Sequence, residues 1–255
     1  MLRVNEGMAL LLRTGSGATL VDAGRSPVEA WRELARNRVR RLDTLVVTHP
    51  DADHTGGAAF LLERMRVGRF AFPRALGERA EIVPLRRLAR LRGAEEVALE
   101  RGQGARFGGA DWEVLWPPGV MEGVDNDASL VGRVSMGGHR AIVTGDIEAA
   151  GESALLACGE RIGAEILQLP HHGSRTSSTA PFLAAVAPAI ALAATGARPR
   201  FAYPSPSVAG RVAALPAVLV SQGGGEPWVA WDERGPLRVG PEPVVTVTGA
   251  RGRGP

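Results

Sequence analysis

Short apolar runs, each with the length of a buried strand, recur along this sequence, and four of them lead directly into an aspartate or a histidine. Asp22 follows "TLV", His49 follows "LVVT", Asp146 follows "AIVTG" and His171 follows "ILQLP". Patterns typical of helices separate the runs, which predicts a layered α/β fold with sheets inside and helices outside. Because the carboxyl ends of strands in such folds converge on one crevice, the four polar ends predict a shared site.

The order of the elements favours a mixed fold, because it contains both hairpins and crossovers. We expect strands within residues 8–14, 18–24, 42–49, 69–73, 110–118, 128–146, 163–173, 189–195, 217–221 and 227–232. We expect helices over residues 27–37, 56–66, 84–93, 148–158 and 206–214.

The composition predicts a folded domain, since 255 residues with 45% hydrophobic content can bury a substantial core. We expect one domain over residues 1–240 and a flexible tail, rich in Pro, Gly and Arg, over 241–255. The apolar tract at 180–197 has the length of a membrane span, but Pro188 divides it, so we expect a helix, a turn and a buried strand. No signal-peptide pattern is present, and the abrupt entry into a strand suggests a piece of a longer protein.

The cysteine, arginine and histidine contents restrict the kinds of site that this chain can form. The single cysteine, Cys158, excludes an intrachain disulfide and a cysteine-based zinc site, and we expect it to serve packing rather than act as a nucleophile. All 30 basic residues are arginines, although the formal net charge is only +3. We expect the arginine-rich helix at 84–93 to present a solvated face, with a phosphate-tracking surface as the alternative. His139, in a hairpin-like turn, is expected to face solvent.

The stretch "VVTHPDADHTGG" at 46–57 places His49, Asp51, Asp53 and His54 within six positions. Carboxylates this close together cannot all remain ionised without positive charge nearby, and the motif contains no arginine. Divalent metal ions supply that charge and also use imidazoles as ligands. A set of nitrogen and oxygen ligands without sulfur, rich in carboxylates, favours Mn²⁺ or Zn²⁺ over a soft metal.

"THPDADHTGG" resembles the HxHxDH signature of the metallo-β-lactamase fold, with Asp51 in place of the usual second histidine. "NDASLVGRV", "VTGDIE" and "LPHHGSRTSS" follow in order, and the whole set is similar to the soluble C-terminal domain of ComEC-type competence proteins, the inner-membrane channels for DNA uptake. The resemblance runs from about residue 4 to about residue 232. It implies an α/β fold, the four-layer αββα sandwich of the metallo-β-lactamase type, and a hydrolase with two divalent metal ions.

The resemblance also assigns roles. His49 and Asp51 would face one ion, Asp53 and His54 would face the other, and Asp146 would bridge them. Asp53 and Asp146 would lie beside the attacking water as the catalytic pair. The implied metal ligands are His49, Asp51, Asp53, His54, Asp146 and His172. Supporting or substrate-contacting roles fall to Asp22, Asn126, Ser129, His171, Ser174, Arg175 and Tyr203.

Several of these assignments have alternatives. The alternative role of Asp22 is that of a turn residue or helix cap. His171 could be a metal ligand or could support one. The family's usual middle histidine is missing, and "DNDASL" stands there with Asn126 and Ser129, so one metal ion is short of a protein ligand. In "FAYPSP", Tyr203 occupies the place of a histidine that the competence branch tends to have near its end.

The resemblance implies a nuclease that degrades the DNA strand that is not imported. Because a carboxylate stands in place of an imidazole, we expect the nuclease to favour Mn²⁺, with Zn²⁺ as the alternative. It further implies attachment to the bacterial inner membrane through a channel part of the same longer protein. Arg175, next to the metal ligands, is the expected DNA contact. Two alternatives stay open: a hydrolase of small esters, lactones or thioesters, and a catalytically weak module that binds DNA or a partner.

Overall fold

The computed structural model describes residues 1–121, 126–196, 202–222, 227–230 and 235–240. Two large sheets pack face to face, with strand orders β1-β2-β3-β4-β5 and β12-β11-β10-β9-β8-β7-β6, and β13 and β14 form a separate hairpin. The strands are β1 (Leu10–Arg13), β2 (Ala18–Val21), β3 (Arg41–Val46), β4 (Arg66–Pro73), β5 (Glu95–Leu99), β6 (Gly104–Phe107), β7 (Ala110–Trp116), β8 (Val131–Met136), β9 (His139–Val143), β10 (Ile166–Gln168), β11 (Ile190–Ala193), β12 (Val218–Ser221), β13 (Trp228–Ala230) and β14 (Arg238–Gly240).

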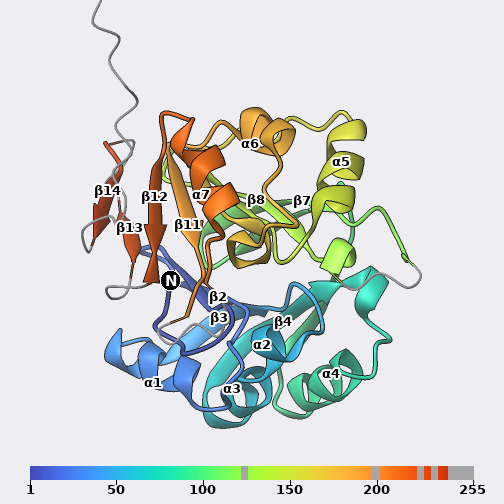
Figure 1. Cartoon of the computed structure of the whole chain (residues 1–255). Coiled ribbons are helices and arrows are strands. Elements are labelled where there is room, and N and C mark those ends of the chain that lie inside the picture. The colour runs from blue at the N-terminus through green and yellow to red at the C-terminus, as the bar shows by residue number, and fades with distance from the viewer. Residues whose placement is uncertain (122–125, 197–201, 223–226, 231–234, 241–255) are drawn as a thin grey trace, which may run out of the picture.

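Helices cover the outer faces of both sheets (Figure 1). They are α1 (Glu29–Arg36), α2 (Ala52–Thr55), α3 (Ala58–Arg64), α4 (Ile82–Leu91), α5 (Ala149–Ala157), α6 (Ala180–Val186) and α7 (Pro206–Ala213), with short 3₁₀ turns η1 (Arg74–Leu76), η2 (Asn126–Ala128) and η3 (Pro170–Gly173). The expected four-layer αββα sandwich is thereby confirmed.

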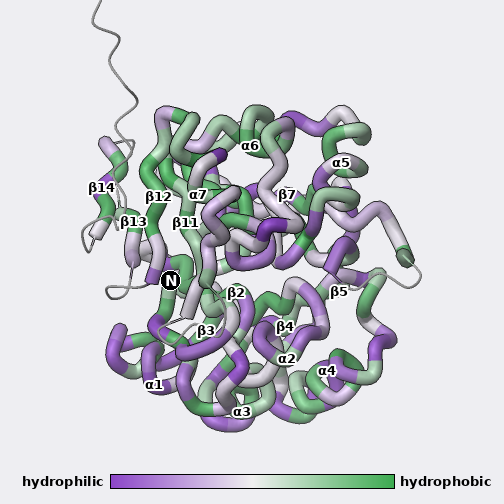
Figure 2. Tube along the Cα trace, in the orientation of Figure 1, coloured by the Kyte–Doolittle hydropathy of each residue, from purple (hydrophilic) through white to green (hydrophobic). Residues whose placement is uncertain are grey.

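The alternation of side chains along the strands builds the layers. In β3, Leu45 packs under the helices of the first half while Val46 points to the opposite sheet. In β11, Leu192 faces the inter-sheet core while Ala193 faces the helices of the second half. Successive side chains of a strand point to opposite faces, so one strand contributes to both the core between the sheets and the core under the helices. Both faces of the strand must then be apolar, which explains the continuous apolar runs (Figure 2).

Most of the predicted elements are found, and the misses have a common cause. Strands β5, β6 and β14 were not predicted, because these strands are short and carry charged, partly exposed side chains. The tract at 180–197 gives α6 and β11, as expected. Among the described residues, no helix combines the length and the apolar character needed to cross a membrane. The predicted tail at 241–255 lies outside the described residues.

Two expectations about single features have different outcomes. Helix α4 is amphipathic, as expected: Leu85 and Ala89 are buried, while Arg86 and Arg90 form ion pairs with Glu96 on the outer side. The solvent-facing placement of His139 is wrong. This residue opens β9, is half-buried, and has Nε2 2.9 Å from the carbonyl oxygen of Gly235, because the chain returns over it 96 residues later.

Parallel pairing places the functional ends of the strands together. β2, β3 and β4 run parallel in the first sheet, and β9, β10 and β11 run parallel in the second. The loops at their carboxyl ends meet between the sheets, where the amide of Leu130 donates a hydrogen bond to the carbonyl of Thr48 at 2.9 Å. The crevice predicted from the four polar strand ends lies at this edge.

Candidate metal centre

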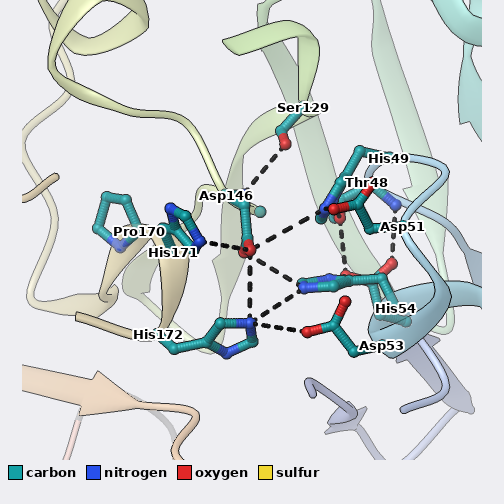
Figure 3. A network of polar contacts seen from close by, with 12 residues as sticks. Thr48, His49, Asp51, Asp53, His54, Ser129, Asp146, Pro170, His171 and His172 are labelled. Atoms are coloured by element: carbon teal, nitrogen blue, oxygen red, sulfur yellow. Dashed lines mark hydrogen bonds and ion pairs between the residues drawn. The ribbon is translucent and has the colours of Figure 1, made fainter. Parts of the chain in front are cut away.

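The buried carboxylate of Asp146 occupies the middle of this crevice (Figure 3). Its oxygens lie within 4.0 Å of one Nε2 atom on each of four imidazoles: 3.3 Å from His54, 3.4 Å from His172, 3.8 Å from His171 and 4.0 Å from His49. Asp53 joins the group through an oxygen 3.4 Å from His172 Nε2. One carboxylate thus faces imidazoles from two separate segments of the chain, residues 49–54 and 171–172.

Hydrogen bonds fix the orientation of His49. Thr48 Oγ1 lies 2.7 Å from a carboxylate oxygen of Asp22 and 3.0 Å from His49 Nδ1. Because the hydroxyl has one proton and the carboxylate can only accept it, His49 must donate through Nδ1–H to the hydroxyl oxygen. The lone pair of His49 Nε2 therefore points into the crevice.

The same pattern holds for the other two central imidazoles. His54 donates Nδ1–H to Asp22 at 2.7 Å, and His172 donates Nδ1–H to the carbonyl of Ala194 at 2.7 Å. Their Nε2 atoms lie 3.3 Å apart. His172 reaches this position from a backbone with φ of 58°, and His171 has φ of 49°, which are unusual values for residues with side chains and are typical of functional sites.

The electrostatics of the crevice call for added positive charge. Burial alone would lower the pKa of His54, but Asp146 and Asp22 outweigh it and hold that pKa well above the usual range. Burial likewise opposes the charged form of His172, yet Asp146 and Asp53 raise its pKa to about 9. Without metal ions, the carboxylates are therefore balanced by protons on these two imidazoles.

His49 behaves differently. Its burial and the neighbouring His54 lower its pKa to about 3, so this imidazole stays neutral. For Asp146, burial would raise the pKa, but His54 and His172 hold it well below its usual range, so it stays an anion. A neutral imidazole beside a buried carboxylate is the protonation state that metal ligation requires.

The donor atoms fit divalent metal ions. His49 Nε2 is buried without a hydrogen-bond partner, and Asp146 Oδ1 also makes no hydrogen bond in the described part of the protein. Two groups of converging ligand atoms are present: His49, His54 and Asp146, and Asp53, His54 and His172. Asp51 lies at the open side of the first group, half-exposed, with an oxygen 3.9 Å from His49 Nε2. Imidazole nitrogens and carboxylate oxygens without sulfur suit Mn²⁺ or Zn²⁺.

The residues expected in supporting roles lie around this centre. Asp22 accepts hydrogen bonds from the amide and hydroxyl of Thr48 and from His54, so it orients both motif histidines rather than acting as a helix cap. The hydroxyl of Ser129 accepts the amide proton of Asp146 at 3.1 Å. Asn126 contributes its backbone carbonyl, which accepts from the amide of Ser129. The segment that stands where the family usually has a histidine therefore holds the backbone amide of Asp146 in place.

The remaining predicted residues are farther from the centre or at its rim. The ring of Tyr203 stacks on His172, with centroids 6.0 Å apart and planes 19° from parallel. His171 approaches Asp146 but also pairs its Nδ1 with Glu148 at 3.0 Å. Ser174 is buried and its hydroxyl lies 2.9 Å from that of Thr176, while Arg175 is exposed.

Three further residues position the centre and were not predicted. Thr48 links Asp22 to His49, Glu148 holds His171, and Asp127 accepts the amide protons of Glu148 and Gly151 at 2.7 and 3.1 Å. Each of them lies within two residues of a predicted site residue, and this proximity in sequence was the one signal that could have identified them. Their partners, however, lie up to 26 residues away along the chain.

Comparison with known proteins agrees with this geometry. The sequence model of the metallo-beta-lactamase superfamily matches residues 2–197. The chain belongs to that superfamily. The solved structure of the metallo-beta-lactamase fold protein YhfI from Bacillus subtilis superposes with a TM-score of 0.58 at 14% identity, covering 86% of this chain and 94% of that one. This likeness shows the shared fold.

The curated relatives of this chain include competence proteins. The chain is 34% identical to Competence protein ComA of Neisseria gonorrhoeae over 213 residues, covering 82% of this chain and 28% of the relative. It is 29% identical to ComE operon protein 3 of Bacillus subtilis (75% of this chain, 27% of the relative) and 28% identical to Recombination protein 2 of Haemophilus influenzae (83% and 26%). The expected likeness to ComEC-type proteins is confirmed, and the chain spans about a quarter of the length of these relatives.

Proposed function

We propose that this superfamily member is a metal-dependent phosphodiesterase that hydrolyses DNA. The central Asp146 carboxylate, within 4.0 Å of four imidazole nitrogens, carries the proposal of a metal-dependent hydrolase. The likeness to competence proteins over most of the chain supports DNA as the substrate.

We assign the ligands to two groups that would share the carboxylate of Asp146. His49 and Asp51 would hold one ion, Asp53, His54 and His172 would hold the other, and Asp146 would serve both. When bound, two such ions activate water and neutralise the charge of a scissile phosphate and of its leaving oxygen. Asp53 and Asp146 would orient the attacking water between the two groups.

The first ion would have fewer protein ligands than the second. Ser129, in the region of the missing histidine, uses its hydroxyl oxygen to hold the amide of Asp146. Asp51 supplies a harder oxygen donor where the family usually has an imidazole, and it is exposed enough to adjust to substrate. We therefore expect weaker, Mn²⁺-favouring binding at this position.

The likeness to DNA-uptake proteins extends the proposal to a biological role. The domain would belong to a longer protein with a channel part at the inner membrane and would degrade the strand that is not imported. Arg175 is exposed and three residues from His172, a position from which a guanidinium can meet a phosphate flanking the cut. Tyr203 would contact the substrate through its hydroxyl at the rim beside His172.

The decisive experiment uses end-labelled single- and double-stranded DNA. The metal-free protein is incubated with each DNA and with Mn²⁺, Mg²⁺ or Zn²⁺ in turn, beside an Asp146→Ala control. We expect cleavage by the parent protein, highest with Mn²⁺, and loss of both activity and most bound metal in the variant. A variant with full metal content in elemental analysis would overturn the ligand assignment. Metal-loaded parent protein without cleavage would favour a module that only binds DNA or a partner.

A small-molecule hydrolase is the second candidate, because one observation favours it. The chain is 35% identical over 118 residues to a hydroxyacylglutathione hydrolase of Pseudomonas aeruginosa, which covers 45% of this chain and 39% of that enzyme. Turnover of a thioester or lactone by the same metal-loaded protein, without DNA cleavage, would decide for it.

A further inference from the structure

A depression of about 440 Å³ lies far from the metal centre, between helix α1, the start of β3 and the end of helix α3. Trp31 and the guanidinium side chains of Arg38, Arg40 and Arg64 surround it, and Val39 and Met65 contribute apolar surface. The volume falls within the range of small-ligand pockets and would accommodate a nucleotide unit. Figure 1 shows α1 and α3 on the outer side of the first sheet, and the two helices are in contact.

The charge of this depression is unbalanced. No carboxylate lines it in the part of the chain that the structure describes, and Arg38, Arg40 and Arg64 form no ion pair there. By contrast, neighbouring arginines are paired: Arg36 with Glu33, and Arg69 with Glu95. Three guanidinium groups around one hollow repel one another unless an anion joins them, and phosphate is the anion that their fork geometry suits.

An aromatic platform stands beside the three arginines. Trp31 is 39% exposed, unusual for so large an apolar side chain, and Phe60 supports it from one side with ring centroids 5.8 Å apart and planes at 72°. Phe60 also carries the guanidinium of Arg64 at 5.4 Å from its centroid, so the aromatic pair and one arginine form a single unit. An exposed ring with cations beside it is the combination that binds single-stranded nucleic acid by stacking a base and holding the backbone.

The depression and the metal centre lie at opposite ends of the same strand. Arg40 and Arg41 precede or open β3, whereas His49 follows its carboxyl end. The strand Arg41–Val46 alone separates the two ends by about 17 Å, at roughly 3.3 Å per residue. We propose that this depression is a second nucleic-acid site, in which a base of a single strand stacks on Trp31 and its phosphates meet Arg38, Arg40 and Arg64. The role of anchoring the strand away from the cut rests on the proposed function, whereas binding of a single strand in the depression does not require hydrolysis.

Binding to a fluorescein-labelled oligodeoxythymidylate, measured by anisotropy over a salt series, tests the site without cleavage. Ca²⁺ replaces the catalytic ion, and a second series contains EDTA, which removes binding that depends on metal ions. We expect Trp31→Ala to weaken binding by about tenfold and Trp31→Phe to retain most of it. Arg38→Ala/Arg40→Ala should make the slope of log affinity against log salt shallower by about 1.4, since each phosphate contact on a single strand contributes about 0.7.

The matched control is Arg140→Ala/Arg161→Ala, which removes two exposed charges in the second half of the chain. It should leave the slope unchanged. Ultraviolet cross-linking should attach an oligonucleotide that contains 5-iodouracil to the tryptic peptide 26–32, which contains Trp31. Unchanged affinity in the Trp31→Ala and double-arginine variants, or an equal slope change in the control, overturns the site. Loss of binding to phosphatidylglycerol vesicles in the double-arginine variant, with oligonucleotide binding intact, overturns it in favour of a membrane surface.

Discussion

The exchange Asp22→Asn should disable the metal centre although Asp22 is not among the proposed ligands. Its Oδ1 accepts the amide proton of Thr48 at 2.8 Å, and its Oδ2 accepts both the Thr48 hydroxyl and His54 Nδ1–H at 2.7 Å. An amide side chain has one accepting and one donating end. Because the backbone amide can only donate, the new oxygen must face it, and the new NH₂ group must take the place of Oδ2.

That orientation changes the tautomer of two imidazoles, those of His54 and His49. The NH₂ group would donate to His54 Nδ1 and to the Thr48 hydroxyl, and the hydroxyl proton would then turn toward His49 Nδ1, 3.0 Å away. Both rings would carry their proton on Nε2, the atom that faces the crevice. Loss of such an orienting partner weakens metal binding by about 10- to 100-fold, or about 1.4–2.8 kcal/mol for each ion.

Competition titrations with a chromogenic chelator would measure both affinities, and urea unfolding would confirm that the variant is folded. Asp43→Asn is the matched control, because Asp43 accepts one backbone proton, from Ala18 at 2.7 Å, at the far end of β3. This control should keep both affinities. Parent-like metal binding in the Asp22→Asn protein would refute the tautomer argument.

Three other outcomes follow from the site. Asp51→His should shift the preferred ion from Mn²⁺ toward Zn²⁺, which cleavage rates with each ion would show; equal rates with both ions in both proteins would count against the assignment. Arg175→Ala should weaken DNA binding uniformly across sequences and make its salt slope shallower by about one unit, with metal content unchanged, as measured with Ca²⁺; an unaltered slope would remove Arg175 from the DNA path. Metal affinity should fall on acidification, since below the His172 pKa of about 9 an incoming ion must displace a proton from that imidazole; titrations over a pH series would check this, and a flat profile would contradict it.

Much of the fold could be predicted from the sequence, because the strands and helices depend on local patterns of apolar and polar residues. Apolar runs such as that of β3 predict buried strands, and the periodic helices α1, α4 and α7 were predicted within a few residues of their ends. The density of Asp and His after these runs singled out the residues that the structure brings together. Strand β5 escaped prediction, since its "EEVAL" sequence reads as polar when its partner strand is unknown.

The tertiary structure decided which atoms face one another. Asp22 orients His54 across 32 residues, and the Ala194 carbonyl orients His172 across 22, and no local pattern encodes these pairings. The partial burial of His139 likewise depends on a segment 96 residues away. Side-chain chemistry and strand periodicity are local properties that a sequence displays directly. Tautomers, shifted pKa values and the basic depression around Trp31 arise from distant segments packed together, so only the folded chain determines them.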